Sequence, residues 1–163
     1  MTSGLICAIL VTVKQEIATP MFLSDTKFEA STITLAQELC QVLKQSYKNW
    51  CINSHEYSIK KLMNEGASKD DFSVQHHLNK IKEIDAELFA EYYTLEEARK
   101  YYKVWRMEGN GRSICCFIDK VTGDIYKAAG TKSPAKGIRY NIHRDWEVIK
   151  KKADWAGSWL YLR

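Results

Sequence analysis

Five basic side chains lie within 18 residues near the C-terminus, and their types and spacing suit the binding of phosphate groups. They are Lys127, Lys132, Lys136, Arg139 and Arg144, with Tyr126, Tyr140, Gly130 and Gly137 between or beside them. Lys and Arg neutralise phosphate charge, glycine lets backbone N–H groups approach a phosphate, and aromatic rings stack on bases. The sequence therefore predicts a nucleic acid interface in which the five cations contact phosphates and Tyr126 and Tyr140 stack on bases. The alternative is an ordinary solvated loop, because the spacing matches no named nucleic acid-binding module.

The aromatic residues near the C-terminus form a second candidate site. Trp155, Trp159 and Tyr161 lie within seven residues of each other in a chain that has five Trp. Such side chains belong by default to the hydrophobic core. Where they are exposed, we expect an interface with a partner protein, because aromatic residues are enriched there.

The residue types that support catalysis or metal binding do not occur in the spacings that this chemistry needs. The four His include no H-E-x-x-H, and the neighbours His76 and His77 point about 100° apart on a helix. The stretch 130–133 lacks the spacing of a phosphate-binding P-loop. Asp119 and Asp124 flank a turn, where Asp usually accepts bonds from backbone N–H groups. We therefore predict no enzyme activity, no catalytic residues, no metal and no cofactor.

Cysteine usage predicts a reducing compartment. The count is odd and contains no C-x-x-C: Cys7, Cys40, Cys51, Cys115 and Cys116. This is typical of free thiols that act as small buried apolar residues in the cytosol, and not of a disulfide framework. A nucleophilic pairing of Cys115 or Cys116 with His143 has no supporting motif.

Composition predicts a globular protein with an uneven charge distribution. The 163 residues are 45% hydrophobic and 27% charged, which is typical of a soluble protein with a core. Residues 1–98 hold 9 Lys and Arg against 14 Asp and Glu, whereas residues 99–163 hold 15 against 6. The basic part favours an anionic partner. The apolar run at 5–13 is too short to span a membrane, so no membrane partner is expected.

The acidic part is predicted to be mainly helical. A strand is expected at 5–13, followed by a helix that begins with a capping box at Thr34 and Gln37. A second helix is expected at 54–65, with Gly66 as its stop. A third begins near Ser73, and its apolar stripe runs through Leu88 to Tyr92. A second capping box at 94–97 predicts a short helix to about Tyr101.

The basic part is predicted to be rich in strands. Alternation indicates strands at 103–107, 113–119 and 124–128, joined by turns at 108–111 and 120–123. Ile114, Cys116 and Ile118 are expected on one face of the middle strand. A helix at 144–153 and a strand at 159–162 are expected to close the chain. The predicted fold is α+β, a single domain over 1–163 in which N-terminal helices pack on a small antiparallel β-meander with a closing helix and strand.

The C-terminal part also resembles a known group of proteins. The phrase at 117–127, Phe-Ile-Asp-Lys-Val-Thr-Gly-Asp-Ile-Tyr-Lys, continues into Pro-Ala-Lys-Gly-Ile-Arg-Tyr-Asn at 134–141. Together with Gly-Ser-Trp-Leu-Tyr at 157–161, it is similar to small uncharacterised proteins encoded by bacteriophages and other viruses. The group usually has a Trp where this chain has Thr131. The resemblance covers residues 101–163 and implies a viral origin but no chemistry.

Two functions therefore remain open for a virus-encoded, non-enzymatic protein. The first is nucleic acid binding through the basic C-terminal loop. The second is a role in a virion or in assembly, through self-association or a viral or host protein partner. In that case the acidic helices of one copy would meet the basic part of another, or the terminal strands would pair between chains. The expected location is the cytoplasm of an infected host cell or the virion.

Overall fold

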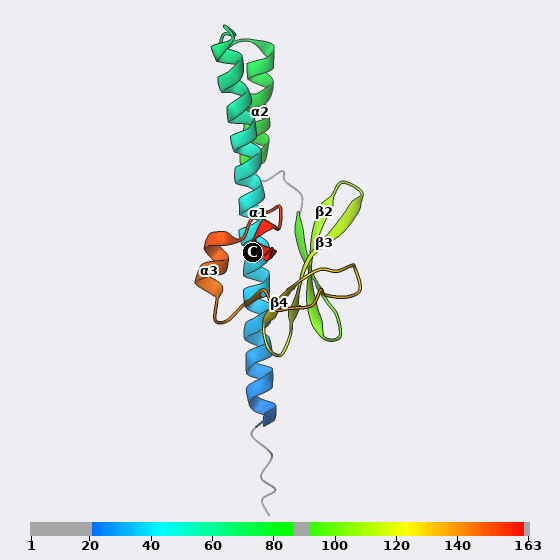
Figure 1. The fold of residues 1–163 in the computed structure, drawn as a ribbon. Helices are drawn as coiled ribbons and strands as arrows, with labels where there is room; N and C mark the ends of the chain where they lie inside the picture. Colours follow the sequence, from blue (N-terminus) through cyan, green and yellow to red (C-terminus); the bar gives the residue numbers. More distant parts are fainter. Residues whose placement is uncertain (1–20, 87–91, 162–163) are drawn as a thin grey trace, which may run out of the picture.

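The computed structural model describes residues 21–86 and 92–161, with side chains from residue 31 onward. The predicted strand at 5–13 and Cys7 lie outside these residues. The architecture is α+β, as the sequence predicts, with helices before an antiparallel sheet (Figure 1). The elements are α1 (Met21–Asn64), α2 (Phe72–Asp85), β1 (Tyr93–Glu97), β2 (Tyr101–Glu108), β3 (Gly111–Asp119), β4 (Asp124–Lys127), β5 (Tyr140–Asn141), α3 (Trp146–Lys152) and the short 3-10 helix η1 (Ser158–Leu160).

One uninterrupted helix, α1, replaces the two helices expected before Gly66. It has 44 residues, so it extends about 66 Å at 1.5 Å per residue. The predicted start at Thr34 and the predicted break before Ser54 are both wrong. No Gly or Pro occurs between Met21 and Asn64, so a polar residue with capping potential is not enough to interrupt the backbone hydrogen bonds.

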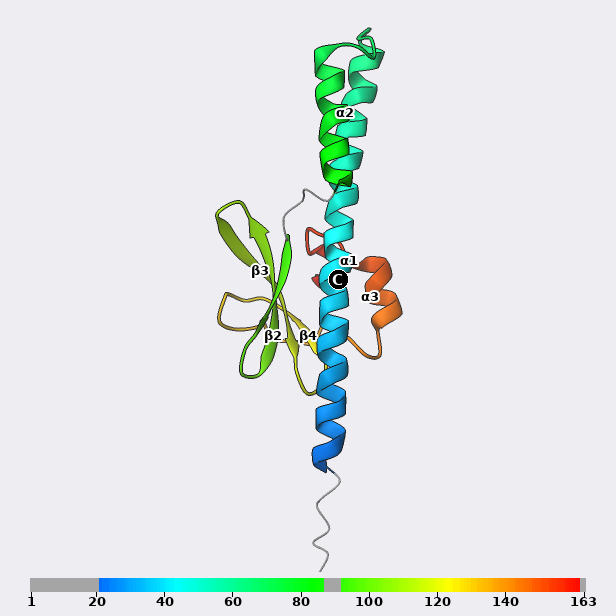
Figure 2. The same ribbon diagram turned by 180° about the vertical axis from the view of Figure 1, so that it is seen from behind.

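The second half of α1 pairs with α2 to form a helical hairpin, which we call the arm (residues 50–64 with α2). Gly66 lies in the turn that follows α1 and has a φ of 97°, a conformation that glycine adopts without strain. Asp71 then caps α2 by accepting a hydrogen bond from the Ser73 N–H at 2.9 Å. The arm projects beyond the sheet (Figure 2). The apolar stripe of this helix is predicted to reach Tyr92, but α2 ends at Asp85. Leu88 lies outside the described residues.

The sheet has five antiparallel strands in the order β1-β2-β3-β4-β5. The short helix expected at 94–101 is wrong, because Tyr93–Glu97 pairs with β2 from Tyr93 opposite Arg106 to Glu97 opposite Tyr102. A capping box is a local signal, whereas this strand is stabilised by a partner further along the chain. The predicted strands at 103–107, 113–119 and 124–128 are confirmed within a few residues.

An irregularity in the β2–β3 pairing changes which residues share a face. Val104 pairs with Cys116 and the next residue, Trp105, pairs with Ile114, so Cys115 is an extra residue in β3. Paired residues lie on one face and consecutive residues on opposite faces. Ile114 is therefore on the face opposite Cys116, and its predicted place beside Cys116 and Ile118 is wrong.

The chain ends in helical turns. The helix expected at 144–153 is confirmed as α3, but the strand expected at 159–162 is wrong. Residues 158–160 form η1, and the consecutive residues Trp159 and Leu160 are both buried. An alternating strand would bury only one of the two, so the alternation in the sequence was misleading.

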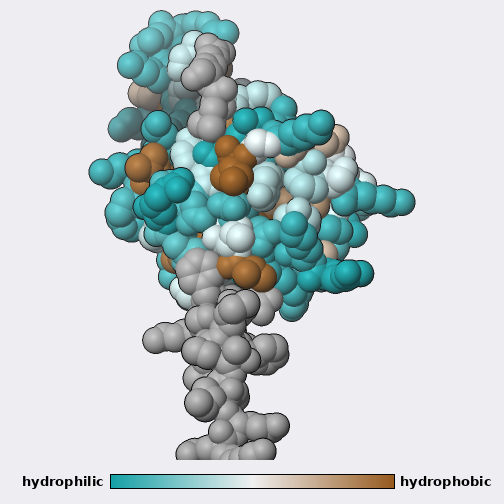
Figure 3. All heavy atoms as spheres, turned by 60° about the horizontal axis from the view of Figure 1, so that its bottom comes forward, coloured by the Kyte–Doolittle hydropathy of each residue, from teal (hydrophilic) through white to brown (hydrophobic). Residues whose placement is uncertain are grey.

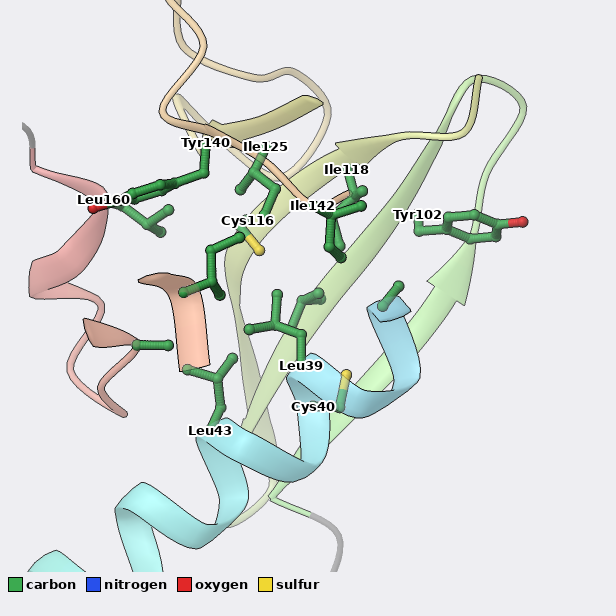
Figure 4. Close-up of a cluster of buried hydrophobic side chains, with 14 of the residues drawn as sticks. Leu39, Cys40, Leu43, Tyr102, Cys116, Ile118, Ile125, Tyr140, Ile142 and Leu160 are labelled. Atoms are coloured by element: carbon green, nitrogen blue, oxygen red, sulfur yellow. The ribbon is translucent and has the colours of Figure 1, made fainter. Parts of the chain in front are cut away.

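The helical and β-rich parts share one core (Figure 4). Leu39 and Leu43 of α1 pack with Ile118, Ile125 and other side chains of the sheet. In Figures 1 and 2, α3 lies on the other side of α1 from the sheet. The first half of α1 therefore organises the fold, and it holds the C-terminal segment beside the sheet.

A buried contact between α1 and the C-terminal part predicts a pH dependence of stability. His143 Nε2 lies 2.9 Å from Thr32 Oγ1, and burial lowers the pKa of His143. The pKa of His55 is lowered as well, by burial and by the neighbouring His77. The unfolded chain therefore binds protons more readily than the folded chain below pH ~6.5, the ordinary His value.

We therefore expect the free energy of unfolding to fall as the pH drops below about 6.5, until both folded His residues are protonated. Thermal melting across this range measures the effect. The variant His143→Gln, which keeps a polar side chain but does not titrate, should show a shallower dependence. An unchanged dependence in this variant would contradict the assignment to His143.

Candidate nucleic acid interface

A cleft of about 270 Å³ lies between the sheet and the C-terminal segment. One wall comes from β2, β3 and β4, and the other from residues 155–161. Its lining residues are Arg106, Ser113, Ile114, Cys115, Lys127, Ala128, Trp155, Ala156, Gly157, Leu160 and Tyr161. The cleft thus combines two basic side chains with two aromatic ones.

The two cations of the cleft lie on the same face of the sheet. Lys127 pairs with Cys116 in the sheet, and Arg106 is two residues after Val104, which pairs with the same Cys116. The Arg106 guanidinium forms an ion pair with Glu108 through Nη2. Its Nε is buried and has no hydrogen-bond partner. A buried donor without a partner is uncommon in folded proteins.

Tyr161 is the exposed ring of the cleft. Tyr161 is 61% exposed, and the Lys127 Nζ lies 3.7 Å from its ring centroid, within cation–π distance. Lys127 therefore places a positive charge directly beside an accessible aromatic ring.

Trp155 is held in place by backbone contacts on both sides. The Tyr93 hydroxyl donates to the Trp155 carbonyl at 2.7 Å, and the Trp155 N–H donates to Ser46 Oγ at 3.2 Å. The Trp155 ring lies 4.6 Å from the half-exposed ring of Trp50. Because β1 and α1 both fix Trp155, this wall of the cleft is preorganised.

The predicted phosphate contacts differ in their surroundings. Lys127 lines the cleft, while Lys132 and Lys136 are exposed in the loop that follows β4, and Arg139 is half-buried. Arg144 is exposed, but its Nε and Nη2 donate to the Asp145 carboxylate at 2.9 and 2.8 Å. The charge of Arg144 is thus largely balanced within the protein.

The predicted stacking residues do not lie in the cleft. Tyr140 is only 8% exposed and packs against Trp159, so its predicted role as a stacking platform is wrong. Tyr126 is half-buried beside Tyr101, and it lies on the opposite face of the sheet from Lys127, because consecutive residues of a strand face opposite ways.

The predicted protein interface is also divided. Trp159 is a core residue at 5% exposure, so its predicted place in an interface is wrong. Trp155 and Tyr161 lie at the cleft with Lys127. The sequence analysis missed Arg106 and Trp50. Arg106 fits the alternation of its strand and Trp50 fits the apolar stripe of its helix, so neither stood out as a site residue.

The geometry of the Asp, His and Cys side chains fits local roles. Asp119 accepts hydrogen bonds from the Val121 and Thr122 N–H groups at 3.0 and 3.1 Å, as predicted for a turn. Nδ1 of His77 lies 2.9 Å from Nδ1 of His55, a contact between α1 and α2 that the sequence analysis did not foresee. Within the described residues, no three His, Cys, Asp or Glu side chains gather as a metal site would require.

Two buried thiols have raised pKa values. Burial raises the pKa of Cys40 to about 12. A hydrogen bond with Cys115, together with burial, raises the pKa of Cys116 well above its ordinary value. Cys40 and Cys116 are buried as predicted, whereas Cys51 and Cys115 are half-buried. A raised pKa lowers the thiolate fraction, so these two buried thiols are poor nucleophiles.

Figure 3 shows one end of the molecule, whose surface is mostly hydrophilic. Hydrophobic side chains form small, separate spots there. On the face that Figure 3 shows, the described residues form no large apolar patch. Among the residues that the structure describes, none of the helices has the length and apolar character needed to cross a bilayer.

Comparison with known proteins identifies a family without a known activity. No curated protein and no solved structure matches the chain. The profile of a family of unknown function (DUF7717) matches residues 22–162, which include the arm, the sheet and the cleft. Because this match spans most of its length, the chain belongs to that family of unknown function.

Proposed function

We propose that this chain is a virus-encoded, non-enzymatic protein that binds nucleic acid through the cleft and the basic loop beside it. The observation that carries the proposal is the cleft itself, where Arg106 and Lys127 lie with the exposed ring of Tyr161. The viral origin is supported by the resemblance over residues 101–163. We place the protein in the cytoplasm of an infected cell or in the virion.

The electrostatic layout supports this function. Residues 99–163 carry a net charge of +9 by the counts above, and the exposed Lys132 and Lys136 lie shortly after Lys127 in the chain. Positive charge beside an aromatic ring is the combination that single strands require, since cations contact the backbone and rings stack on bases. Arg106 adds a donor with an unpaired Nε.

Fluorescence anisotropy with a mixed-sequence single strand of about 20 nucleotides tests the proposal over a range of salt concentrations. We expect the affinity to fall steeply as salt rises, because binding releases counterions from the phosphates. The triple variant Lys132→Ala, Lys136→Ala, Arg139→Ala should reduce the slope of log affinity against log salt by about 2, at about 0.7 per lost contact. No binding by the wild type would overturn the proposal. An unchanged slope in the variant would show that the loop does not contact the nucleic acid.

A second candidate function, assembly, is favoured by the exposed apolar side chains of the arm. Phe72 is 84% and Tyr57 is 71% exposed. Within the arm only Val74 and Ile84 are buried, while Ile52, Ile59, Leu62, Leu78 and Ile81 are half-buried. Two helices alone leave part of such a stripe in water, whereas a four-helix bundle covers it. We propose that, if the protein self-associates, two arms pair.

The double variant Tyr57→Ser, Phe72→Ser tests this second function. Light scattering at increasing concentration should show an oligomer for the wild type and a weaker tendency to associate for the variant. Val121→Ser is the matched control, because Val121 is an exposed apolar residue in the β3–β4 turn, away from the arm. A monomeric wild type at all concentrations would refute arm pairing.

A further inference from the structure

We propose that the cleft holds one unpaired base of a single strand, and that the protein consequently prefers single-stranded nucleic acid to a duplex. This inference rests on the proposed function, since it specifies the form of nucleic acid that the same site accepts. It assigns stacking to Tyr161, in place of Tyr126 and Tyr140.

The size of the cleft sets the first limit. Its volume of about 270 Å³ is below the range of about 300–1,000 Å³ that is usual for sites of drug-sized ligands. A single base or nucleoside is small enough, and a base pair or a helical segment is not. A base that fills this space has therefore left its stack.

The chemistry of the walls sets the second limit. Lys127 lies over the ring of Tyr161, and this residue is nevertheless 61% exposed. A planar base can stack on the exposed part of this ring while Lys127 contacts the adjacent phosphate. Arg106 lines the same cleft, so its guanidinium adds a second group that can donate to base carbonyl or ring nitrogen atoms.

The second aromatic wall continues away from the cleft. Trp155 lines it, and its ring lies 4.6 Å from that of Trp50 on α1. Trp50 is half-exposed. A nucleic acid strand that leaves the cleft in this direction therefore meets another accessible ring. A single strand is flexible enough to take this path.

The preference for single strands follows from the cost of removing a base from a duplex. A paired base must be unstacked and unpaired before it can enter, whereas a base in a single strand is largely free of that cost. We expect the single strand to bind at least about tenfold more tightly than a duplex of the same length, because unstacking costs a few kcal/mol.

The test uses hexathymidine, a strand of the same length that carries the sugar-phosphate backbone without bases, and a short duplex. The short length limits the number of protein molecules that can bind one strand. Three proteins are compared by anisotropy: wild type, Tyr161→Phe, which keeps the ring, and Tyr161→Ala, which removes it. Circular dichroism confirms that the variants are folded.

We expect the wild type and Tyr161→Phe to bind hexathymidine about tenfold more tightly than the strand without bases, as one stacked base predicts. Tyr161→Ala should bind the two strands alike. If the wild type binds hexathymidine, the strand without bases and the duplex equally, the base pocket is refuted while nucleic acid binding stands. If the wild type binds none of the three, nor the longer strand used above, both the pocket and the proposed function are refuted.

Discussion

Replacing both cations of the cleft, in the double variant Arg106→Ala, Lys127→Ala, is expected to weaken binding of a single strand about 100-fold. Each cation supplies a charge-assisted contact, and two such contacts are worth about 3 kcal/mol or more. The slope of log affinity against log salt should also fall by about 0.7, because Lys127 is the cation of the cleft that contacts a phosphate. Anisotropy titrations at several salt concentrations measure both effects.

The control for this variant removes the same net charge elsewhere. Lys60 and Lys69 are exposed residues at the far part of the arm, so Lys60→Ala, Lys69→Ala leaves the cleft intact. We expect this control to bind nearly as the wild type does. An equal loss in both double variants would show that net charge alone governs binding and that the cleft has no special role.

Gly123→Ala is expected to destabilise the protein by about 3 kcal/mol, through backbone strain and overpacking together. Gly123 has a φ of 74°, which L side chains rarely adopt. A Cβ at this position would lie 2.5 Å from His143 Cδ2 and 3.1 Å from Ile142 Cγ2. His143 is itself in contact with Thr32 of α1, so it cannot move away freely. Urea denaturation measures the loss.

Gly109→Ala separates the two causes. Gly109 has a φ of 54°, and a Cβ there would meet no atom within 4 Å. The free energy of unfolding of this control should fall by only about 1 kcal/mol, which is the cost of the left-handed backbone. If the two variants lose the same amount, the close approach of the β3–β4 turn to His143 does not contribute to stability.

The predictable parts of the fold are those set by local pattern. The strands β2, β3 and β4 follow from alternation and from turn residues such as Gly109 and Gly123, and α3 follows from its apolar spacing. The errors occur where a local signal competes with a tertiary one. Thr94 begins a capping box in the sequence, yet its strand is held by pairing with Trp105 of β2. Thr34 also has a capping pattern, yet α1 already extends upstream of it.

The candidate site was predicted in pieces. The sequence predicts Lys127 as a phosphate contact and Tyr161 as an interface residue, but only the fold brings them together. They are separated by 34 positions, and no periodicity links a strand residue to a turn after η1. Arg106 was missed because one charged residue in an alternating strand normally faces water. Its place in the lining of the cleft depends on the neighbouring walls, which only the fold brings together.

The most direct test of the central claim is ultraviolet crosslinking of a single-stranded oligonucleotide to the wild-type protein, followed by mass spectrometry of the peptides. We expect crosslinks at the aromatic residues of the cleft, Trp155 and Tyr161, and their loss when the Arg106→Ala, Lys127→Ala variant replaces the wild type. Crosslinks confined to the arm, at Tyr57 or Phe72, or crosslinks that persist at the same sites in the variant, would contradict it.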